Sequence, residues 1–291
     1  MCRWRAGAKE TPHIWKRRPS APAAFWGGSR GWRIWRGSCA APGSGSGNTL
    51  PGTEAGSSGR MADEGVLDGR TEYLGSFLTD SRRAGIERVL AQRTRYLTIV
   101  LEDIYQPHNA SAVLRSCECF GIQDVHIVED RNAYTVSRDV VLGAAQWLDL
   151  IRYRSQEGKS VRTCCGELRS AGYRLVAALP SEESAVGELD GVSVGSPLAV
   201  FFGNEEEGLT AAVREEVAEH IRIPMFGFTK SFNISVSAAL ILRELTRRMR
   251  SSPVPWQLSD EEKQSLRLKW YRRMVKGSDL LEQRYLKERA R

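Results

Sequence analysis

The sequence has no apolar stretch of the length that crosses a bilayer, and only four histidines among its 291 residues. A transmembrane helix needs about 20 predominantly apolar residues, so none is expected. No histidine stands at ligand spacing from a cysteine, and neither Cys117 with Cys119 nor Cys164 with Cys165 has the spacing of a zinc knuckle. We therefore expect no metal site, and we interpret the cysteines as reduced thiols of a cytoplasmic protein.

A glycine-rich nucleotide-binding loop is missing as well. The alternating Gly and Ser at 43–47 come nearest to one, but no strand pattern precedes them. The dinucleotide-binding fingerprint requires a strand before its glycines and a helix after them. A Rossmann-type site is therefore not expected in this chain.

Residues 1–60 lack any folding pattern. They hold five of the eight tryptophans, scattered without helical or alternating period among Arg, Gly, Ser and Pro. We expect 1–60 to be a disordered upstream extension assigned in error, and the natural chain to start at Met61. The alternative is a transit peptide, because the segment is basic and poor in acidic residues, although it has neither a clean amphipathic face nor an apolar core segment.

The net charge of +7 comes from that same segment. Residues 1–60 hold ten of the 42 Lys and Arg and two of the 35 Asp and Glu, which leaves 32 basic and 33 acidic residues in 61–291. Within this nearly neutral part, residues 243–291 carry fourteen basic and seven acidic side chains. A basic C-terminal region has the sign of charge that phosphate groups require.

The middle of the chain alternates short apolar runs with helical patterns, which is typical of a parallel sheet covered on both faces. Strands are expected at 96–101, 125–128, 150–153, 173–178, 198–202 and 220–224, and helices at 108–120, 160–171, 210–219 and 233–249. A capping box at Ser259 begins a further helix, and Gly277 ends it. We expect N-terminal helices over 61–95, an α/β domain over 96–250 and a basic helical extension over 251–291.

Three segments place polar residues where predicted strands end. In the first, Asn109 lies in the first turn of the helix at 108–120 and Arg115 lies beside its apolar stripe. Alone, these residues would be a helix cap and a surface charge. The second, FGNEEEGL at 202–209, is a strand end followed by an acidic loop bounded by glycines. Alone, it would be a solvated turn before a helix.

The third segment, IPMFGFTKSFNISVSAA at 223–239, joins a strand end to a helix of small residues through a polar loop. Ser231 and Asn233 would lie there beside the free backbone N–H groups of the helix start. Ligand sites at the strand ends of α/β proteins are built in this way. Alone, the segment would be a plain loop with Ser231 as the helix cap.

Taken together and in this order, the three segments resemble the motifs of the SpoU/TrmH branch of the SPOUT family, which are RNA ribose 2′-O-methyltransferases. The resemblance covers about residues 70–250, and its third motif is the most specific. It implies an α/β fold with a parallel sheet and a C-terminal trefoil knot, flanked here by N-terminal helices and the basic C-terminal extension. Knots are almost absent from proteins, so this part of the expectation comes from the resemblance alone.

The resemblance also implies a cofactor and a set of site residues. S-adenosylmethionine is expected to bind in a bent shape within the knot, largely through backbone atoms. The positions matched to cofactor contacts are Ala178, Gly203, Ile223, Met225, Ser231 and Phe232. The positions matched to catalysis are Asn109, Arg115, Glu205, Ser231 and Asn233. Ala178 departs from the family, where threonine is frequent, and so does Phe232, where leucine is usual.

The family mechanism gives Arg115 the role of a base or of a clamp for the phosphate of the target nucleotide. We favour the clamp, because a guanidinium with a pKa above about 12 does not give up its proton but lowers the pKa of a nearby hydroxyl electrostatically. Asn109 and Asn233 would position the ribose and the cofactor, and Glu205 would orient Arg115 or its loop. Family members are homodimers with a shared site, and the same is expected here.

The layout of the chain resembles the tRNA enzymes that methylate guanosine 18 of the D-loop, because short N-terminal helices and a basic helical tail flank the core. The RNA contacts expected besides Arg115 are Arg267, Lys269, Arg272, Arg273 and Lys276, with Leu268, Tyr271 and Val275 facing the body. The alternatives are a ribose in rRNA or at another tRNA position, a non-catalytic RNA-binding protein with this fold, and a nucleotide-binding α/β protein unrelated to RNA.

Overall fold

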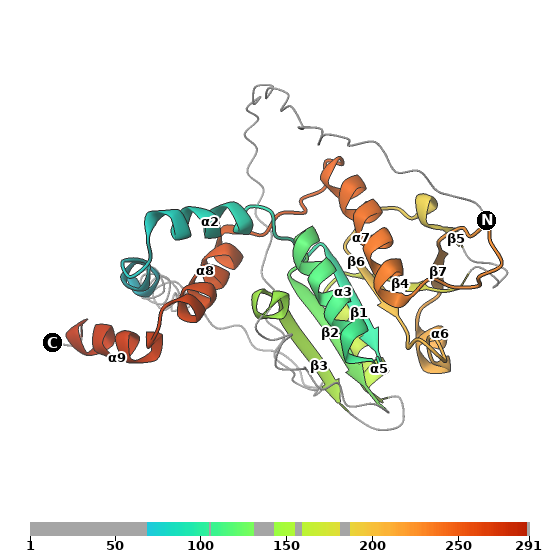
Figure 1. Cartoon of the computed structure of the whole chain (residues 1–291), viewed down its shortest axis with the longest axis horizontal. Coiled ribbons are helices and arrows are strands. Elements are labelled where there is room, and N and C mark those ends of the chain that lie inside the picture. Colours follow the sequence, from blue (N-terminus) through green and yellow to red (C-terminus); the bar gives the residue numbers. More distant parts are fainter. Residues whose placement is uncertain (1–68, 105, 131–142, 155–158, 181–186, 290–291) are drawn as a thin grey trace, which may run out of the picture. The chain divides into compact units, whose positions relative to one another are not determined.

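The computed structural model describes residues 69–104, 106–130, 143–154, 159–180 and 187–289. The expected extension at 1–60 and the start at Met61 lie outside these ranges. At the centre of the described part is a seven-stranded sheet in the order β3-β2-β1-β6-β4-β7-β5 (Figure 1). Every strand pairs with its neighbours in parallel, as predicted.

The strands are β1 (Leu97–Glu102), β2 (Asp124–Glu129), β3 (Asp149–Arg154), β4 (Arg174–Ala178), β5 (Gly187–Glu188), β6 (Leu198–Phe202) and β7 (Glu219–Arg222). The helices are α2 (Asp80–Leu90), α3 (Pro107–Phe120), α5 (Lys159–Ser170), α6 (Ala211–Glu216), α7 (Ile234–Arg250), α8 (Asp260–Met274) and α9 (Ser278–Arg289). Short 3₁₀ turns occupy η1 (Ala144–Trp147) and η2 (Leu189–Gly191), and residues 69–75 are helical.

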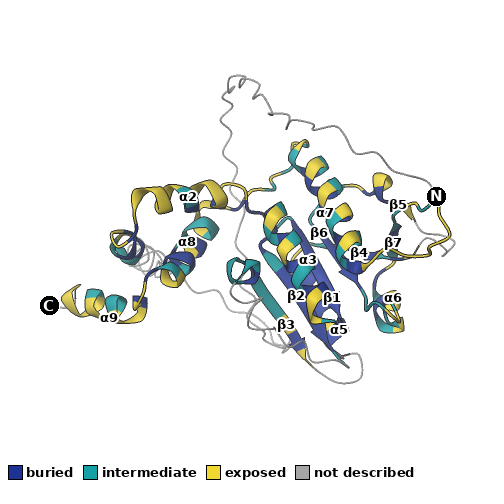
Figure 2. Ribbon diagram, in the orientation of Figure 1, coloured by how far each residue is buried: buried dark blue, intermediate teal, exposed yellow. Residues whose placement is uncertain are grey.

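Side-chain alternation along the strands divides the core into two layers. In β1, Leu97, Ile99 and Leu101 join the apolar cluster under α3 and α7, while Val100 joins the cluster under α5 and α6. A sheet that is covered on both faces has no polar side, so its central strands β1, β2, β4 and β6 are almost wholly buried, while β3, β7 and β5 towards its edges are partly exposed (Figure 2). This explains why the strands of this sequence appear as continuous apolar runs.

All six predicted strands and the four core helices are confirmed, with shifts at their ends. The helix expected over 210–219 ends at Glu216, because Val217 turns into the core and Glu219 already begins β7. The two-residue strand β5 was not predicted, since two residues carry no periodicity. The trefoil knot and the three domain boundaries stay predictions.

The helices outside the α/β layers form an apolar cluster of their own. Leu74 and Leu90 pack there with Leu268, Trp270 and Tyr271 of α8. The capping box is confirmed: Ser259 Oγ accepts from the Glu262 N–H at 3.1 Å, and Glu262 Oε2 accepts from the Ser259 N–H at 2.8 Å. The predicted inward face of Leu268, Tyr271 and Val275 is buried.

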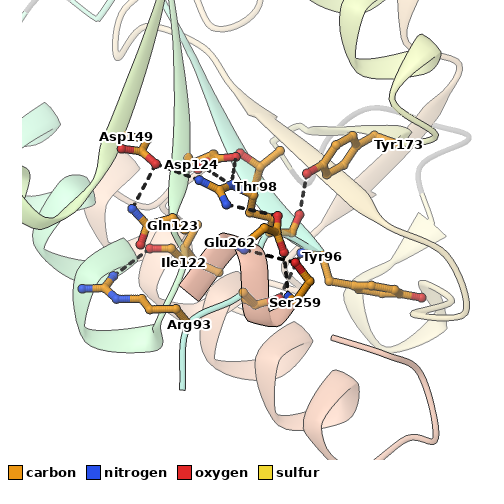
Figure 3. Close-up of polar contacts among 12 residues, drawn as sticks. Arg93, Tyr96, Thr98, Ile122, Gln123, Asp124, Asp149, Tyr173, Ser259 and Glu262 are labelled. Carbon is orange, nitrogen blue, oxygen red and sulfur yellow. Dashed lines mark hydrogen bonds and ion pairs between the residues drawn. The ribbon is translucent and has the colours of Figure 1, made fainter. Parts of the chain in front are cut away.

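One arginine ties this helical region to the amino ends of the strands. Arg95 donates to Asp124 at the start of β2 (2.9 Å), to Asp149 at the start of β3 (2.9 Å) and to Glu262 of α8 (3.1 Å). Figure 3 shows these three carboxylates converging from different elements. Burial raises the pKa of Asp124 to about 6, against the opposing effect of the Arg95 charge.

Replacing Arg95 by methionine should lower the free energy of unfolding by about 2–3 kcal/mol at pH 8, because it leaves part-buried carboxylates without their cation. The ordinary pKa of an aspartate is about 3.9, whereas the pKa of Asp124 in the folded chain is about 6. The free energy of unfolding therefore falls as the pH rises from about 3.9 to about 6, because the unfolded chain loses this proton first. Without Arg95 the folded-state pKa is higher still, so the loss is larger. The deficit should therefore shrink as the pH falls through 6 in urea titrations. The control is Arg83→Met, which removes an exposed pair with Asp80 and should cost under about 0.5 kcal/mol. A deficit of equal size at pH 5 and pH 8 would contradict the assignment.

Candidate functional site

The three motif segments meet at the carboxyl edge of the sheet. β1, β6, β4 and β7 are consecutive neighbours there, and the connections to α3, α6 and α7 leave from the ends of β1, β6 and β7. In parallel α/β sheets this edge is where ligands bind, because strand ends and helix starts converge on it. The topology therefore gathers polar residues that lie far apart in sequence.

The loop after β6 is held in one conformation by its own backbone. Asn204 and Gly208 exchange N–H···O bonds of 3.1 and 3.0 Å, and Asn204 Oδ1 accepts from the N–H groups of Glu206 (2.7 Å) and Glu207 (3.0 Å). Gly208 has a φ of +73°. A Cβ on Gly203 would lie 2.2 Å from the carbonyl carbon of Gly208. Both glycines that bound the loop are therefore required by its geometry.

Sequence reasoning missed the residue that anchors this loop to β1. Glu102 is buried, and it accepts from the Thr210 N–H at 2.9 Å and from the Thr210 hydroxyl at 2.5 Å. Burial raises the pKa of Glu102, and the two bonds from Thr210 oppose that rise. The available signal was a carboxylate at the end of an otherwise apolar strand, which needs a partner if it is buried.

The centre of the site is a hydrogen-bonded set of three side chains. The Asn109 amide donates to Glu205 Oε1 at 2.7 Å, and Asn109 Oδ1 accepts from the Asn233 amide at 3.2 Å. Asn109 also donates to Gln106 at 3.2 Å and is buried. The structure thus brings together Asn109, Glu205 and Asn233, three of the five residues that the sequence matched to catalysis.

Asn233 is fixed because it also caps α7. Its Oδ1 accepts from the Ser235 N–H at 2.9 Å and from the Ser235 hydroxyl at 2.6 Å, which leaves its amide nitrogen to donate to Asn109. The cap is therefore Asn233, which excludes the alternative in which Ser231 caps the helix. Ser231 is exposed in the loop just before it.

A cavity of about 390 Å³ lies beside this set, a size within the usual range for small-molecule sites. All six positions matched to cofactor contacts line it: Ala178, Gly203, Ile223, Met225, Ser231 and Phe232. Glu205 and Asn233 line it too, and Pro180, Ser237 and Ile241 complete walls that the sequence had not assigned. The lining combines apolar side chains, such as Ile223, Met225 and Phe232, with the carboxylates of Glu205, Glu206 and Glu207, so the cavity suits a ligand with an apolar part and a polar part.

Arg115 is not part of this set. It lies on the exposed side of α3 and makes no hydrogen bond or ion pair with the described residues. Glu205 bonds to Asn109 and not to Arg115, so the expectation that Glu205 orients Arg115 does not hold within one chain. The second oxygen of Glu205 is buried and has no partner in the described part.

The cations predicted to contact RNA on α8 are largely paired within the chain. Arg267 bonds to Glu87 (2.5 and 2.7 Å), Arg272 bonds to Glu282 (2.6 and 2.7 Å) and Lys269 pairs with Asp149. Arg273 and Lys276 are exposed. Most of the positive charge expected from this helix is thus neutralised by its own protein, and the RNA contact at α8 stays a prediction.

Three further observations concern metal ligands, membrane-spanning helices and thiols in the described ranges. No group of three or more His, Cys, Asp or Glu residues that could hold a metal ion occurs among them. No helix in that part of the chain is both long and apolar enough to cross a membrane. Cys117, Cys164 and Cys165 are free and buried, and Cys119 is free and exposed.

Comparisons with known proteins agree on one family. Residues 96–243 match the SpoU rRNA Methylase family. The chain is 41% identical over 220 residues to a tRNA (guanosine(18)-2'-O)-methyltransferase of Borreliella burgdorferi, covering 76% of this chain and 97% of that protein. A protein of the same name from Thermus thermophilus is 32% identical over 58% of this chain and 84% of its own. The crystal structure of the A. aeolicus TrmH/SpoU tRNA modifying enzyme superposes with a TM-score of 0.56 at 26% identity, covering 67% of this chain and 98% of that one.

Replacing Gly203 by alanine should lower the free energy of unfolding by about 1–3 kcal/mol. The new methyl group would meet only backbone atoms, Gly208 and the Leu209 nitrogen at 2.2–2.3 Å, which cannot rotate away. The matched control is Gly227→Ala in the loop before α7, where no atom lies within 4 Å of the place that the new methyl group would take. Denaturant titration of both variants checks the prediction, and equal stability would show that the loop can relax.

Proposed function

This chain belongs to the SpoU rRNA methylase family, and on that premise we propose that it transfers the methyl group of S-adenosylmethionine to the 2′-hydroxyl of guanosine 18 in the D-loop of tRNA. The observation that carries the proposal is the joining of Asn109, Glu205 and Asn233 at the edge of the cavity. The likeness to the Borreliella burgdorferi protein, which extends over nearly its whole length, supports tRNA as the substrate.

The residues around the cavity fit S-adenosylmethionine. Ile223, Met225 and Phe232 offer apolar contact to an adenine, and the loops at 203–208 and 223–233 line the space with backbone groups. Gly203 lacks a side chain where the backbone of Gly208 and Leu209 passes close to it. When bound, S-adenosylmethionine would supply a methyl group that its sulfonium sulfur activates for attack by an oxygen nucleophile.

The three joined side chains would hold the ribose. Glu205 has one oxygen occupied by Asn109 and one buried oxygen without a partner in the described ranges, and that free acceptor suits a ribose hydroxyl. The Asn109 and Asn233 amides are held by each other, so they would orient the nucleophile with little reorganisation. Methyl transfer breaks the carbon–sulfur bond and forms a carbon–oxygen bond, and the hydroxyl proton leaves to solvent or to a nearby acceptor.

Arg115 would act across a homodimer. It is exposed and outside the cavity of its own chain, yet the phosphate clamp needs it beside the target nucleotide. α3 packs against α7, and on α7 Val236 and Leu240 are 44% and 39% exposed, next to Phe232 at 42%. This apolar strip suits a second copy of the chain, which would place Arg115 of the partner subunit near the cavity. The trefoil knot and a cytoplasmic location remain part of the same proposal.

Three other functions compete with this one. A ribose in rRNA is the second candidate, because the matched family is described by rRNA methylation. A non-catalytic RNA-binding protein is disfavoured, since binding alone requires neither the buried amide set nor an adjoining cavity. A nucleotide-binding protein unrelated to RNA would not explain the family match.

The full chain should transfer labelled methyl groups to unmodified tRNA at the ribose of guanosine 18, as mapped by nuclease digestion. Arg115→Ala should reduce the rate by about 100-fold or more, because one preorganised cation at the reacting centre is lost. Arg115→Lys should lose most of the rate at every pH if the arginine is a bidentate clamp. Arg162→Ala, an exposed arginine on α5, is the control. Transfer to rRNA with none to tRNA would overturn the substrate assignment.

Mixing two inactive variants tests the shared site. In a mixture of Arg115→Ala and Asn233→Ala subunits, half of the randomly formed dimers are mixed, and each of those has one site with both residues intact. The expected activity is about one quarter of the wild-type rate. If Arg115 instead served the site of its own chain, the mixture of the two variants would show no methyl-transfer activity.

A further inference from the structure

A second cavity of the molecule lies away from the methyl-transfer site and is lined by arginines. It has a volume of about 620 Å³ and lies where the C-terminal ends of α2, α3 and α7 come together. Its lining includes Arg88, Arg93, Arg243, Arg247 and Arg250, together with Cys119. We call this cavity the basic groove.

The basic groove has a large excess of positive charge. Its lining contains one carboxylate, Glu118, which pairs with Arg93 at 3.0 Å. Glu244 on α7 is shared by Arg247 at 2.6 Å and Arg243 at 3.7 Å. Five arginines against these two carboxylates leave an excess of three positive charges. This contrasts with α8, where Arg267, Lys269 and Arg272 are each paired.

Two of these arginines have no carboxylate partner among the described residues. Arg250 donates to the Gln92 side chain (2.6 Å) and carbonyl (2.8 Å) and lies over the Trp256 ring at 4.4 Å, so all of these partners are neutral. Arg88 is exposed and makes no hydrogen bond or ion pair with the residues that the structure describes. Like charges gathered in a concave surface repel one another unless an anion occupies it.

The position of the groove suits a long polyanion better than a small one. α7 runs from the methyl-transfer cavity, which Ser237 lines, to the groove, which Arg247 lines. The two residues are ten positions apart, or about 15 Å along the helix axis. A nucleic-acid backbone with a phosphate at each nucleotide can occupy both places at once, and exposed arginines are the usual partners of such phosphates.

We propose that the basic groove binds backbone phosphates of the RNA substrate, at the end of α7 opposite to the side chains that would hold the methylated ribose. The inference rests on the proposed function for the presence of an RNA substrate, and it holds for tRNA or rRNA alike. It moves the main RNA footprint from α8, where the sequence predicted it, to the C-terminal ends of α2 and α7. These contacts position the RNA and do not read its sequence.

The first test is the salt dependence of RNA binding. In the full chain, the double variant Arg88→Gln and Arg247→Gln should bind unmodified tRNA roughly tenfold more weakly. A plot of log K against log salt has a negative slope, and its magnitude should be smaller by about 2, one unit for each lost phosphate contact. Arg162→Gln is the matched control, because Arg162 is exposed on α5 at the opposite face of the sheet. The midpoint of thermal unfolding should be the same for the wild type, the double variant and Arg162→Gln.

The second test uses the thiol that lines the groove. Cys119 is exposed, whereas Cys117, Cys164 and Cys165 are buried, so peptide mass spectrometry can follow its alkylation separately. Saturating tRNA should slow alkylation of Cys119 several-fold in the wild type and much less in the double variant. S-adenosylmethionine alone should leave the rate unchanged, since it would occupy the other cavity.

The outcomes separate this inference from the proposed function. If the double variant binds RNA with wild-type affinity and slope while methylating guanosine 18 normally, the groove assignment is wrong and the function stands. If tRNA is neither bound nor methylated but rRNA slows Cys119 alkylation and the double variant loses that effect, the groove assignment stands and the tRNA assignment is wrong. If no RNA changes the alkylation rate while methylation of tRNA proceeds, the groove is not the RNA footprint.

Discussion

The amide of Asn109 is the contact on which the site depends. It donates to Glu205 and accepts from Asn233, and so joins segments that follow three different strands. Only a side chain with both a donor and an acceptor can make this bridge; an aspartate would face Glu205 with a second negative charge. Because Asn233 also caps α7, the bridge fixes where the helix starts relative to α3 and to the acidic loop.

The polar groups at the amino ends of the strands differ from those at the carboxyl ends. At the amino ends of the strands, Arg95 is surrounded by Asp124, Asp149 and Glu262 (Figure 3), and this cluster joins α8 to the sheet. Arg95 and Lys269 compensate most of the carboxylate charge of this cluster within the protein. At the carboxyl ends, Glu205 keeps a buried oxygen without a partner in the described ranges, and the cavity beside it is lined by backbone. A buried carboxylate oxygen that is left without a protein partner is expected at a binding site, whereas a cluster of ion pairs is expected where two parts of the fold are joined.

α7 connects the features that the proposed reaction needs. Its first turn contributes to the cavity, its exposed Val236 and Leu240 form an apolar strip, and its last turns carry Arg247, Arg248 and Arg250. Cations in the last turn also suit the negative end of the helix dipole. A single rigid helix therefore sets the spacing between the cavity, the proposed subunit contact and the basic groove.

Local chemistry along the chain was enough to locate most of the strands and helices, although not the two-residue strand β5. Apolar runs located β1 to β4, β6 and β7, the capping box located the start of α8, and the motif positions located the loops that hold Glu205 and Asn233. These signals act over a few residues, so they are present in the sequence itself. The tertiary structure alone decided which side chains meet. It paired Arg267 with Glu87 and Arg272 with Glu282, which neutralised much of the charge of a helix that the sequence predicted to be basic, and it placed Arg88 and Arg247 in the lining of one cavity. Such contacts depend on strand order and helix packing, and neither periodicity nor capping specifies those.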